Sequence, residues 1–157
     1  MSDRPGMAER REFITQSEDD TARVAASLAV TLGPGSVVLL YGDLGVGKTA
    51  FVRGMAPALG IDPDAISSPT FALVQPYAGS RGTLLHVDLY RLEGAEVDDL
   101  GLDDLACGAV MVVEWADRMP RPPAGAIHVR LSDLGGEGRL IRIDDPRPAG
   151  SGATETG

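Results

Sequence analysis

Aromatic residues are scarce in this chain, and basic residues are outnumbered by acidic ones. Phe, Trp and Tyr make up 4% of the 157 residues, so the core must be built mainly from aliphatic side chains. The 14 Lys and Arg against 23 Asp and Glu give a formal net charge of −9. Because binding to a nucleic-acid backbone depends on clustered Lys and Arg, this balance argues against a chain that grips RNA or DNA by itself.

The sequence also has little cysteine and no long apolar run. The single cysteine, Cys107, excludes an intrachain disulfide, and no partnered His accompanies it, so we expect a buried, inert thiol. No apolar stretch reaches the roughly 18 residues that cross a membrane, and the N-terminus lacks the apolar segment of a signal peptide. We therefore expect a cytoplasmic protein with no membrane contact.

The length leaves room for one domain with a substantial core. We expect a flexible N-terminus over residues 1–10, a single domain over 11–145 and a disordered tail over 146–157. The tail is rich in Pro, Gly, Ser and Thr, a composition that does not support a packed core.

The domain opens with a short strand and a helix. Residues 11–16 are compatible with a strand, and Ser17 followed by three acidic residues predicts a helix N-terminus. Alanines at helical spacing continue the helix, and Gly33-Pro34-Gly35 is expected to end it.

Two continuous apolar runs, 37–41 and 109–114, indicate strands buried on both faces, as in a parallel sheet. The first is followed by a Gly-rich segment and by helical character over 49–59. Pro57 is expected to end or kink the last turn of that helix.

The remaining segments predict a hairpin, short helices and a closing strand pair. Residues 71–75 and 83–90 flank a Gly-containing turn, which is typical of a β-hairpin. Residues 94–106 predict one or two short helices, and 127–131 with 140–143 predict two final strands. Together these elements predict a three-layer α/β fold of the P-loop NTPase type, with a mixed, mainly parallel sheet and an inserted β-hairpin.

The segment 42–49, GDLGVGKT, matches the phosphate-binding pattern G-x-x-x-x-G-K-T between a buried strand and a helix. Glycines let such a loop curl until its N–H groups point at one anion, and the helix N-terminus adds positive potential. Lys48 is expected to reach the β- and γ-phosphates of ATP, and the Thr49 hydroxyl to ligate Mg²⁺. The alternative is an ordinary Gly-rich turn. The residues expected at the nucleotide phosphates are Gly42, Asp43, Leu44, Gly45, Val46, Gly47, Lys48, Thr49 and Ala50.

A phosphate-binding loop of this kind (a P-loop) needs a second ligand for the metal ion, besides Thr49, at the end of a neighbouring strand. LLHVD ends in Asp88 and matches the Walker B pattern, and VMVVE ends in Glu114 in the same way. Because carboxylates at the carboxyl ends of parallel strands face the ligand crevice, both are candidates for the metal and for catalysis. The alternative is that either is a solvated acid.

Two further polar residues have open interpretations. Thr70, after Ser68 and Pro69, is able to bond a phosphate or a metal-bound water, or simply to cap the next strand. His86 shares a strand face with Asp88, so it either supports that site or is a core histidine with satisfied polar atoms.

The segments Gly42–Thr49, Ser68–Phe71, His86–Arg91 and Glu114–Trp115 together resemble the TsaE (YjeE) family, and the similarity covers roughly residues 10–143. That family consists of small bacterial P-loop ATPases that work with the TsaB and TsaD proteins in making threonylcarbamoyladenosine on tRNA.

The resemblance implies a role for four residues. Thr70 is implied to lie near the γ-phosphate and Mg²⁺, and Asp88 to be the Walker B acid. Glu114 is implied to be the acid needed for hydrolysis, and Trp115 to lie close to the nucleotide. Trp115 is also able to serve simply as a core residue.

The sequence thus predicts a Mg²⁺-dependent ATPase that contacts tRNA only indirectly, through TsaB and TsaD. Slow intrinsic turnover is expected because no Arg stands where it would act as a finger on the γ-phosphate. The alternatives are a non-catalytic nucleotide-gated switch in the same complex and a small-molecule kinase. Residues 92–106 are acidic where a kinase lid would be basic.

Overall fold

The computed structural model describes residues 9–42, 47–67, 74–90, 92, 94–99, 101 and 108–147. The predicted site residues Asp43, Leu44, Gly45, Val46 and Thr70 lie outside these ranges, as does Cys107.

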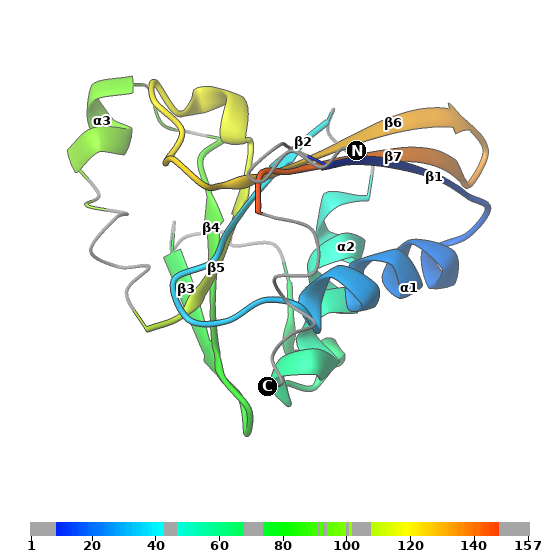
Figure 1. Ribbon diagram of the computed structural model, residues 1–157, viewed down its shortest axis with the longest axis horizontal. Helices are drawn as coiled ribbons and strands as arrows, with labels where there is room; N and C mark the ends of the chain where they lie inside the picture. Colours follow the sequence, from blue (N-terminus) through cyan, green and yellow to red (C-terminus); the bar gives the residue numbers. More distant parts are fainter. Residues whose placement is uncertain are drawn as a thin grey trace, which may run out of the picture.

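A seven-stranded mixed sheet forms the middle of the molecule, in the order β1-β7-β6-β2-β5-β4-β3 (Figure 1). Its strands are β1 (Glu9–Thr15), β2 (Val37–Tyr41), β3 (Val74–Ala78), β4 (Thr83–Asp88), β5 (Val110–Glu114), β6 (Ile127–Gly135) and β7 (Gly138–Asp145). The neighbouring strands β6, β2, β5 and β4 are parallel. β7 and β3 pair antiparallel with the strands beside them. The predicted mixed, mainly parallel sheet is confirmed.

The two apolar runs of the sequence form the centre of this sheet. β2 and β5 pair in parallel, with Val38 opposite Val112 and Leu39 opposite Val113, and all four side chains are fully buried. Alternate residues point to opposite faces, so Val38 and Leu39 belong to two different clusters of the core. Burial on both faces explains why these strands are continuous apolar runs.

One face of the sheet is covered by α1 (Glu18–Ala29) and α2 (Lys48–Met55), which lie side by side (Figure 1). Gly54 permits their close approach, because a Cβ built on it would lie 2.6 Å from the Ala22 Cα and 2.9 Å from the Ala25 Cβ. Leu28, Phe51 and other buried residues of these helices pack on the β-strands below.

The other face carries a thinner layer. Val97 from α3 (Gly94–Asp99) and Ala116 from the 3₁₀ turn η3 (Ala116–Arg118) are buried against residues such as Met111 and Val113 of β5. The short elements on this face complete the predicted three layers.

The helix ends follow the local chemistry that the sequence predicts, with one difference. The Ser17 hydroxyl accepts the Asp20 N–H at 3.1 Å and begins α1. The α-helix ends at Ala29, before the predicted stop at Gly33, because Thr31 and Leu32 donate to carbonyls three residues earlier and tighten the last turn.

α2 ends as predicted near Pro57. The chain changes from α-helix to the 3₁₀ turn η1 (Ala56–Leu59), and Gly60 terminates it with φ 75°. A further 3₁₀ turn, η2 (Pro63–Ala65), follows.

Both predicted strand pairs form antiparallel hairpins, β3–β4 and β6–β7. β3 covers 74–78, so only its start overlaps the predicted strand over 71–75. The described chain continues to Arg147, whose guanidinium donates to both Asp145 carboxylate oxygens and to the Thr31 carbonyl after α1.

Candidate functional site

The predicted site residues that the structure describes lie at the carboxyl ends of β2, β5 and β4. Gly42 follows β2, Glu114 is the last residue of β5, and Asp88 is the last residue of β4. The parallel register places Glu114 beside both Leu40 of β2 and Asp88 of β4. The parallel pairing of β4 and β5 therefore brings two acids that are distant in sequence together.

Gly47 starts α2 with a backbone that favours glycine. It is the N-cap residue, with φ 104° and ψ 20°, in the left-handed region that side chains with a Cβ rarely occupy. Its carbonyl accepts the Phe51 N–H at 3.0 Å, the first bond of the helix. Lys48 and Thr49 consequently occupy the first turn of α2, where the positive end of the helix dipole favours an anion.

Lys48 is nearly fully buried, with a relative exposure of 4%. Its ammonium donates to the Gly42 carbonyl. The same Nζ atom lies 3.9 Å from the ring centroid of Trp115, which makes a cation–π contact. The Lys48 ammonium is therefore held beside Gly42, the first residue of the segment that the sequence predicts to bind phosphate.

Glu114 is the junction of a buried hydrogen-bond cluster. Its Oε2 atom accepts the Thr49 hydroxyl at 3.1 Å and lies 2.6 Å from Nε2 of His86. Glu114 is 4% exposed and His86 is fully buried. The His86 imidazole thus contacts the neighbouring acid Glu114 on β5.

Asp88 is only partly buried, and its Oδ1 atom accepts the Tyr90 N–H at 2.9 Å. Desolvation raises the pKa of Asp88 above its ordinary value, and the negative charge of Glu114 adds to this rise. The Tyr90 N–H and the charges of His86 and Lys48 oppose the rise without cancelling it. Ionisation of Asp88 is therefore harder in the protein than in a fully solvated carboxyl group, and a nearby cation would offset this effect.

Trp115 turns its ring toward the site through a strained backbone. Its φ of 61° and ψ of 44° lie in the left-handed region, which is costly for a bulky residue. The ring packs against Tyr90 at 4.9 Å between centroids, and Arg118 lies 5.9 Å from the Tyr90 ring. The bend after β5 therefore places the Trp115 ring beside the Lys48 ammonium.

These side chains line one cavity of about 340 Å³. Its walls are formed by Glu18, Gly47, Lys48, Thr49, Ala50, Arg53, Asp88, Tyr90, Glu114 and Trp115. The described site residues from the first turn of α2, from both strand ends and from Trp115 thus share a single space.

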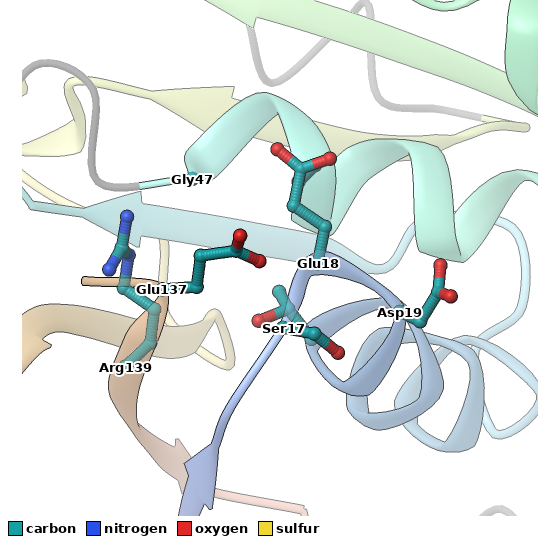
Figure 2. Close-up of a pocket in the computed structure, with 8 residues that line it drawn as sticks. Ser17, Glu18, Asp19, Gly47, Glu137 and Arg139 are labelled. Atoms are coloured by element: carbon teal, nitrogen blue, oxygen red, sulfur yellow. The ribbon is translucent and has the colours of Figure 1, made fainter.

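A second cavity, of about 470 Å³, adjoins the first and shares Glu18, Gly47 and Ala50 with it. Figure 2 shows Glu18 at the start of α1 and the Arg139 side chain of β7 directed toward Gly47. Ser17, Asp19, Thr21 and Glu137 complete its lining.

No local sequence pattern predicts Glu18 or Arg139 as a site residue. Arg139 approaches Gly47 because the β6–β7 hairpin returns beside the start of α2, and its Nε atom lies 3.9 Å from where a Gly47 Cβ would stand. The acidic first turn of α1 predicts a helix start but does not reveal that α1 faces α2.

Among the described residues, no group of three or more His, Cys, Asp or Glu side chains is arranged to hold a metal ion. The described helices are also all too short or too polar to span a membrane.

Comparison with known proteins gives a consistent result. The family model described as threonylcarbamoyl adenosine biosynthesis protein TsaE matches residues 15–141. The tRNA threonylcarbamoyladenosine biosynthesis protein TsaE of Rickettsia bellii is 39% identical over 134 residues, or 84% of this chain and 93% of the relative. The protein of the same name from Treponema pallidum is 44% identical over 133 residues, or 83% of this chain and 97% of the relative.

A solved structure has a similar fold. The crystal structure of YdiB from Bacillus subtilis aligns with a TM-score of 0.70 and 28% identity, covering 88% of this chain and 87% of the other.

Proposed function

The chain belongs to the TsaE family, and on this premise we propose that it is a Mg²⁺-dependent ATPase of tRNA threonylcarbamoyladenosine biosynthesis. It would act with TsaB and TsaD, and it would contact tRNA only through them. The printed names of its relatives support the pathway, and the net charge of −9 supports leaving RNA contact to a partner.

The observation that carries the proposal is the meeting of Lys48, Thr49, Asp88 and Glu114 at one cavity beside the first turn of α2. A buried ammonium, a hydroxyl and two carboxylates are the side chains that phosphoryl-transfer sites use on phosphates and their metal ion. In this proposal the Lys48 ammonium exchanges the Gly42 carbonyl for the β- and γ-phosphates. The amides of Gly42 to Ala50 would surround the same groups.

The donor set fits Mg²⁺, because the Thr49, Asp88 and Glu114 side chains offer hard oxygen ligands. Mg²⁺ normally enters such sites on one or two carboxylates together with phosphate oxygens and water, so an all-protein cage is not required. The ion would neutralise charge on the phosphates. Desolvation raises the pKa of Asp88 and the charge of Glu114 adds to the rise, and a cation beside Asp88 would offset both effects.

The adjoining cavity of about 470 Å³ is where we place the ribose and base. It opens from the phosphate side at Gly47 and Ala50, so a nucleotide would pass from one cavity into the other around the start of α2. The Ser17 and Thr21 hydroxyls and the Arg139 guanidinium supply polar partners along its wall.

Hydrolysis would depend on Glu114, which would position or deprotonate the attacking water, and on Thr70, which would contact the γ-phosphate. We expect slow turnover by the chain alone. The arginines lining the two cavities already donate to backbone carbonyls, Arg53 to Ile66 and Arg139 to Gly138. Trp115, beside Lys48, would cover the nucleotide.

Multiple-turnover tRNA modification, reconstituted from TsaB and TsaD with and without this chain, tests the role. We expect sustained product formation only when the chain and ATP are both present, and faster ATP hydrolysis in the mixture than by the chain alone. Equal yields with and without the chain would exclude the proposed role.

The variant Glu114→Gln separates catalysis from nucleotide gating. Loss of repeated modification with retained assembly on TsaB and TsaD would support hydrolysis as the essential step. Unchanged modification would instead favour a switch that only binds ATP.

A further inference from the structure

Arg53 lines the cavity in which we place the nucleotide phosphates, but it has no assigned role there. It lies in α2, four residues after Thr49, so the two side chains share one face of the helix. Helical side chains lean toward the N-terminus of their helix, which directs Arg53 back toward the first turn. Lys48 and Arg53 are the two cationic side chains among the described residues around this cavity. Both therefore act on any anion that enters it.

One hydrogen bond restricts the orientation of the Arg53 guanidinium. Its Nε–H donates to the Ile66 carbonyl at 3.0 Å. This acceptor is well fixed, because Ile66 is 1% exposed and its own N–H donates to the Pro63 carbonyl at 3.1 Å. A guanidinium is planar, so a bond at Nε also limits the directions of the two terminal NH₂ groups. Arg53 thus carries a preoriented pair of donor groups.

The terminal NH₂ groups of Arg53 have N–H donors that the Ile66 bond does not use. Among the described residues, Arg53 has no second hydrogen-bond acceptor and forms no ion pair. This holds although the carboxylates of Asp88 and Glu114 line the same cavity. Because hydrogen bonds between charged groups are the stronger ones, a phosphate oxygen in the cavity would be a favourable acceptor for these donors.

The two adjoining cavities indicate which phosphate Arg53 would contact. Arg53 does not line the larger cavity of about 470 Å³, where we place the ribose and base. It lines the smaller one together with Asp88 and Glu114, the last residues of β4 and β5. A nucleotide that extends from the larger cavity into the smaller one brings its terminal phosphate furthest toward these strand ends.

We propose that Arg53 binds the γ-phosphate through its terminal NH₂ groups and thereby favours ATP over ADP. This inference rests on the proposed function, because it concerns the same nucleotide. The Ile66 bond holds the guanidinium in one place before and during hydrolysis, so the contact strengthens ATP binding without lowering the barrier to hydrolysis. Such a contact is compatible with the slow turnover that we expect of the chain alone.

Calorimetric titrations with ADP and with the non-hydrolysable analogue AMPPNP, both in Mg²⁺, measure the contribution of the γ-phosphate. Arg53→Gln removes the charge at an exposed helix position. Arg81→Gln is the matched control, because Arg81 is also exposed and donates to a backbone carbonyl, that of Pro57, but lines neither cavity. We expect Arg53→Gln to lower the ratio of the AMPPNP to the ADP association constant by roughly tenfold, through loss of a hydrogen bond to a charged group. Arg81→Gln should change this ratio by less than about twofold.

An unchanged ratio in Arg53→Gln would overturn the inference, and equal losses of affinity for both nucleotides would do the same, because they indicate a structural role through Ile66. Absence of nucleotide binding by the unaltered chain would instead refute the proposed function itself. Nitrogen-15 NMR of the unaltered chain decides the question even if Arg53→Gln does not fold. The signals of the Arg53 terminal nitrogens should shift when Mg·AMPPNP is added but not when Mg·ADP is added. Equal shifts with both nucleotides, or no shift with either, would overturn the inference.

Discussion

At the residue scale, Asp88 shows how a candidate ligand is kept at some cost to folding. Its side chain is partly desolvated beside Glu114, and both effects raise its pKa above the ordinary value of 3.8. A raised pKa in the folded state means that ionisation is easier in the unfolded chain. The ionised carboxylate therefore subtracts stability above the unfolded pKa, and this penalty disappears as the pH falls below it.

We expect Asp88→Asn to stabilise the ligand-free protein slightly at pH 7, by about 0.5 kcal/mol or less because water screens this half-exposed group. The amide oxygen is still able to accept the Tyr90 N–H. The same variant should lose most of the affinity gain that Mg²⁺ gives to ATP. Thermal unfolding at pH 7 and pH 3.5, combined with ATP titration, checks both effects. Destabilisation at pH 7 together with unchanged Mg²⁺ dependence would contradict this assignment of Asp88.

At the scale of secondary-structure elements, the site depends on where α2 begins, and α1 fixes α2 from the side. The two helices touch at Gly54, where a Cβ would meet the Ala22 backbone at 2.6 and 2.7 Å. The first turn of α2 carries Lys48 and Thr49, so a shift of the helix would move both.

Gly54→Ala should destabilise the protein by about 1–3 kcal/mol, because overpacking outweighs the roughly 1 kcal/mol that Ala contributes to helix propensity. Gly33→Ala is the matched control, since no atom lies within 4 Å of its added Cβ. Chemical unfolding of both variants measures the difference. Equal stabilities of the two variants would show that α1 and α2 are not in tight contact at Gly54.

A second link between elements joins the end of β7 to the end of α1. Arg147 donates to both oxygens of the buried Asp145 and to the carbonyl and hydroxyl of Thr31, with donor–acceptor distances of 2.6–2.9 Å. Desolvation raises the pKa of Asp145, but the Arg147 hydrogen bonds and charge more than offset it, so the net pKa lies below 3.8. A lowered pKa stabilises the fold above the unfolded value, and this contribution is lost as the pH falls through the folded value.

Arg147→Ala should therefore cost about 2 kcal/mol at pH 7, where it leaves a buried carboxylate without its partner. The difference from the unaltered chain should shrink below pH 4 as Asp145 becomes protonated in both proteins. Urea unfolding from pH 7 to pH 3 measures this convergence. A difference that stays constant over this range would show that the ion pair does not stabilise the fold.

At the scale of the whole molecule, local patterns predicted the sheet and the strand-end acids but not the contacts between elements. The apolar runs that became β2 and β5 require burial on both faces, so their position at the centre of the sheet followed from composition. The position of Asp88 beside Glu114 followed from the shared edge of parallel strands.

The remainder required tertiary geometry. The Thr49–Glu114 bond joins residues 65 positions apart, and the approach of Arg139 to Gly47 depends on a hairpin at the far end of the chain. Trp115 has a left-handed backbone conformation, which bulky residues rarely adopt, so no local rule predicts it. His86 shares a face with Asp88, as alternation indicates, yet its hydrogen bond is to Glu114 on the next strand.

The central claim is that the first turn of α2 and the strand-end acids form a Mg·ATP site. Isothermal titration of the purified chain with Mg·ATP, beside a folded Lys48→Ala variant, tests it most directly. We predict saturable heat for one site in the unaltered chain and a loss of affinity of at least about a hundredfold in the variant, which lacks the phosphate-binding ammonium. No heat with Mg·ATP, and none with its non-hydrolysable analogue in the presence of TsaB and TsaD, would contradict the account.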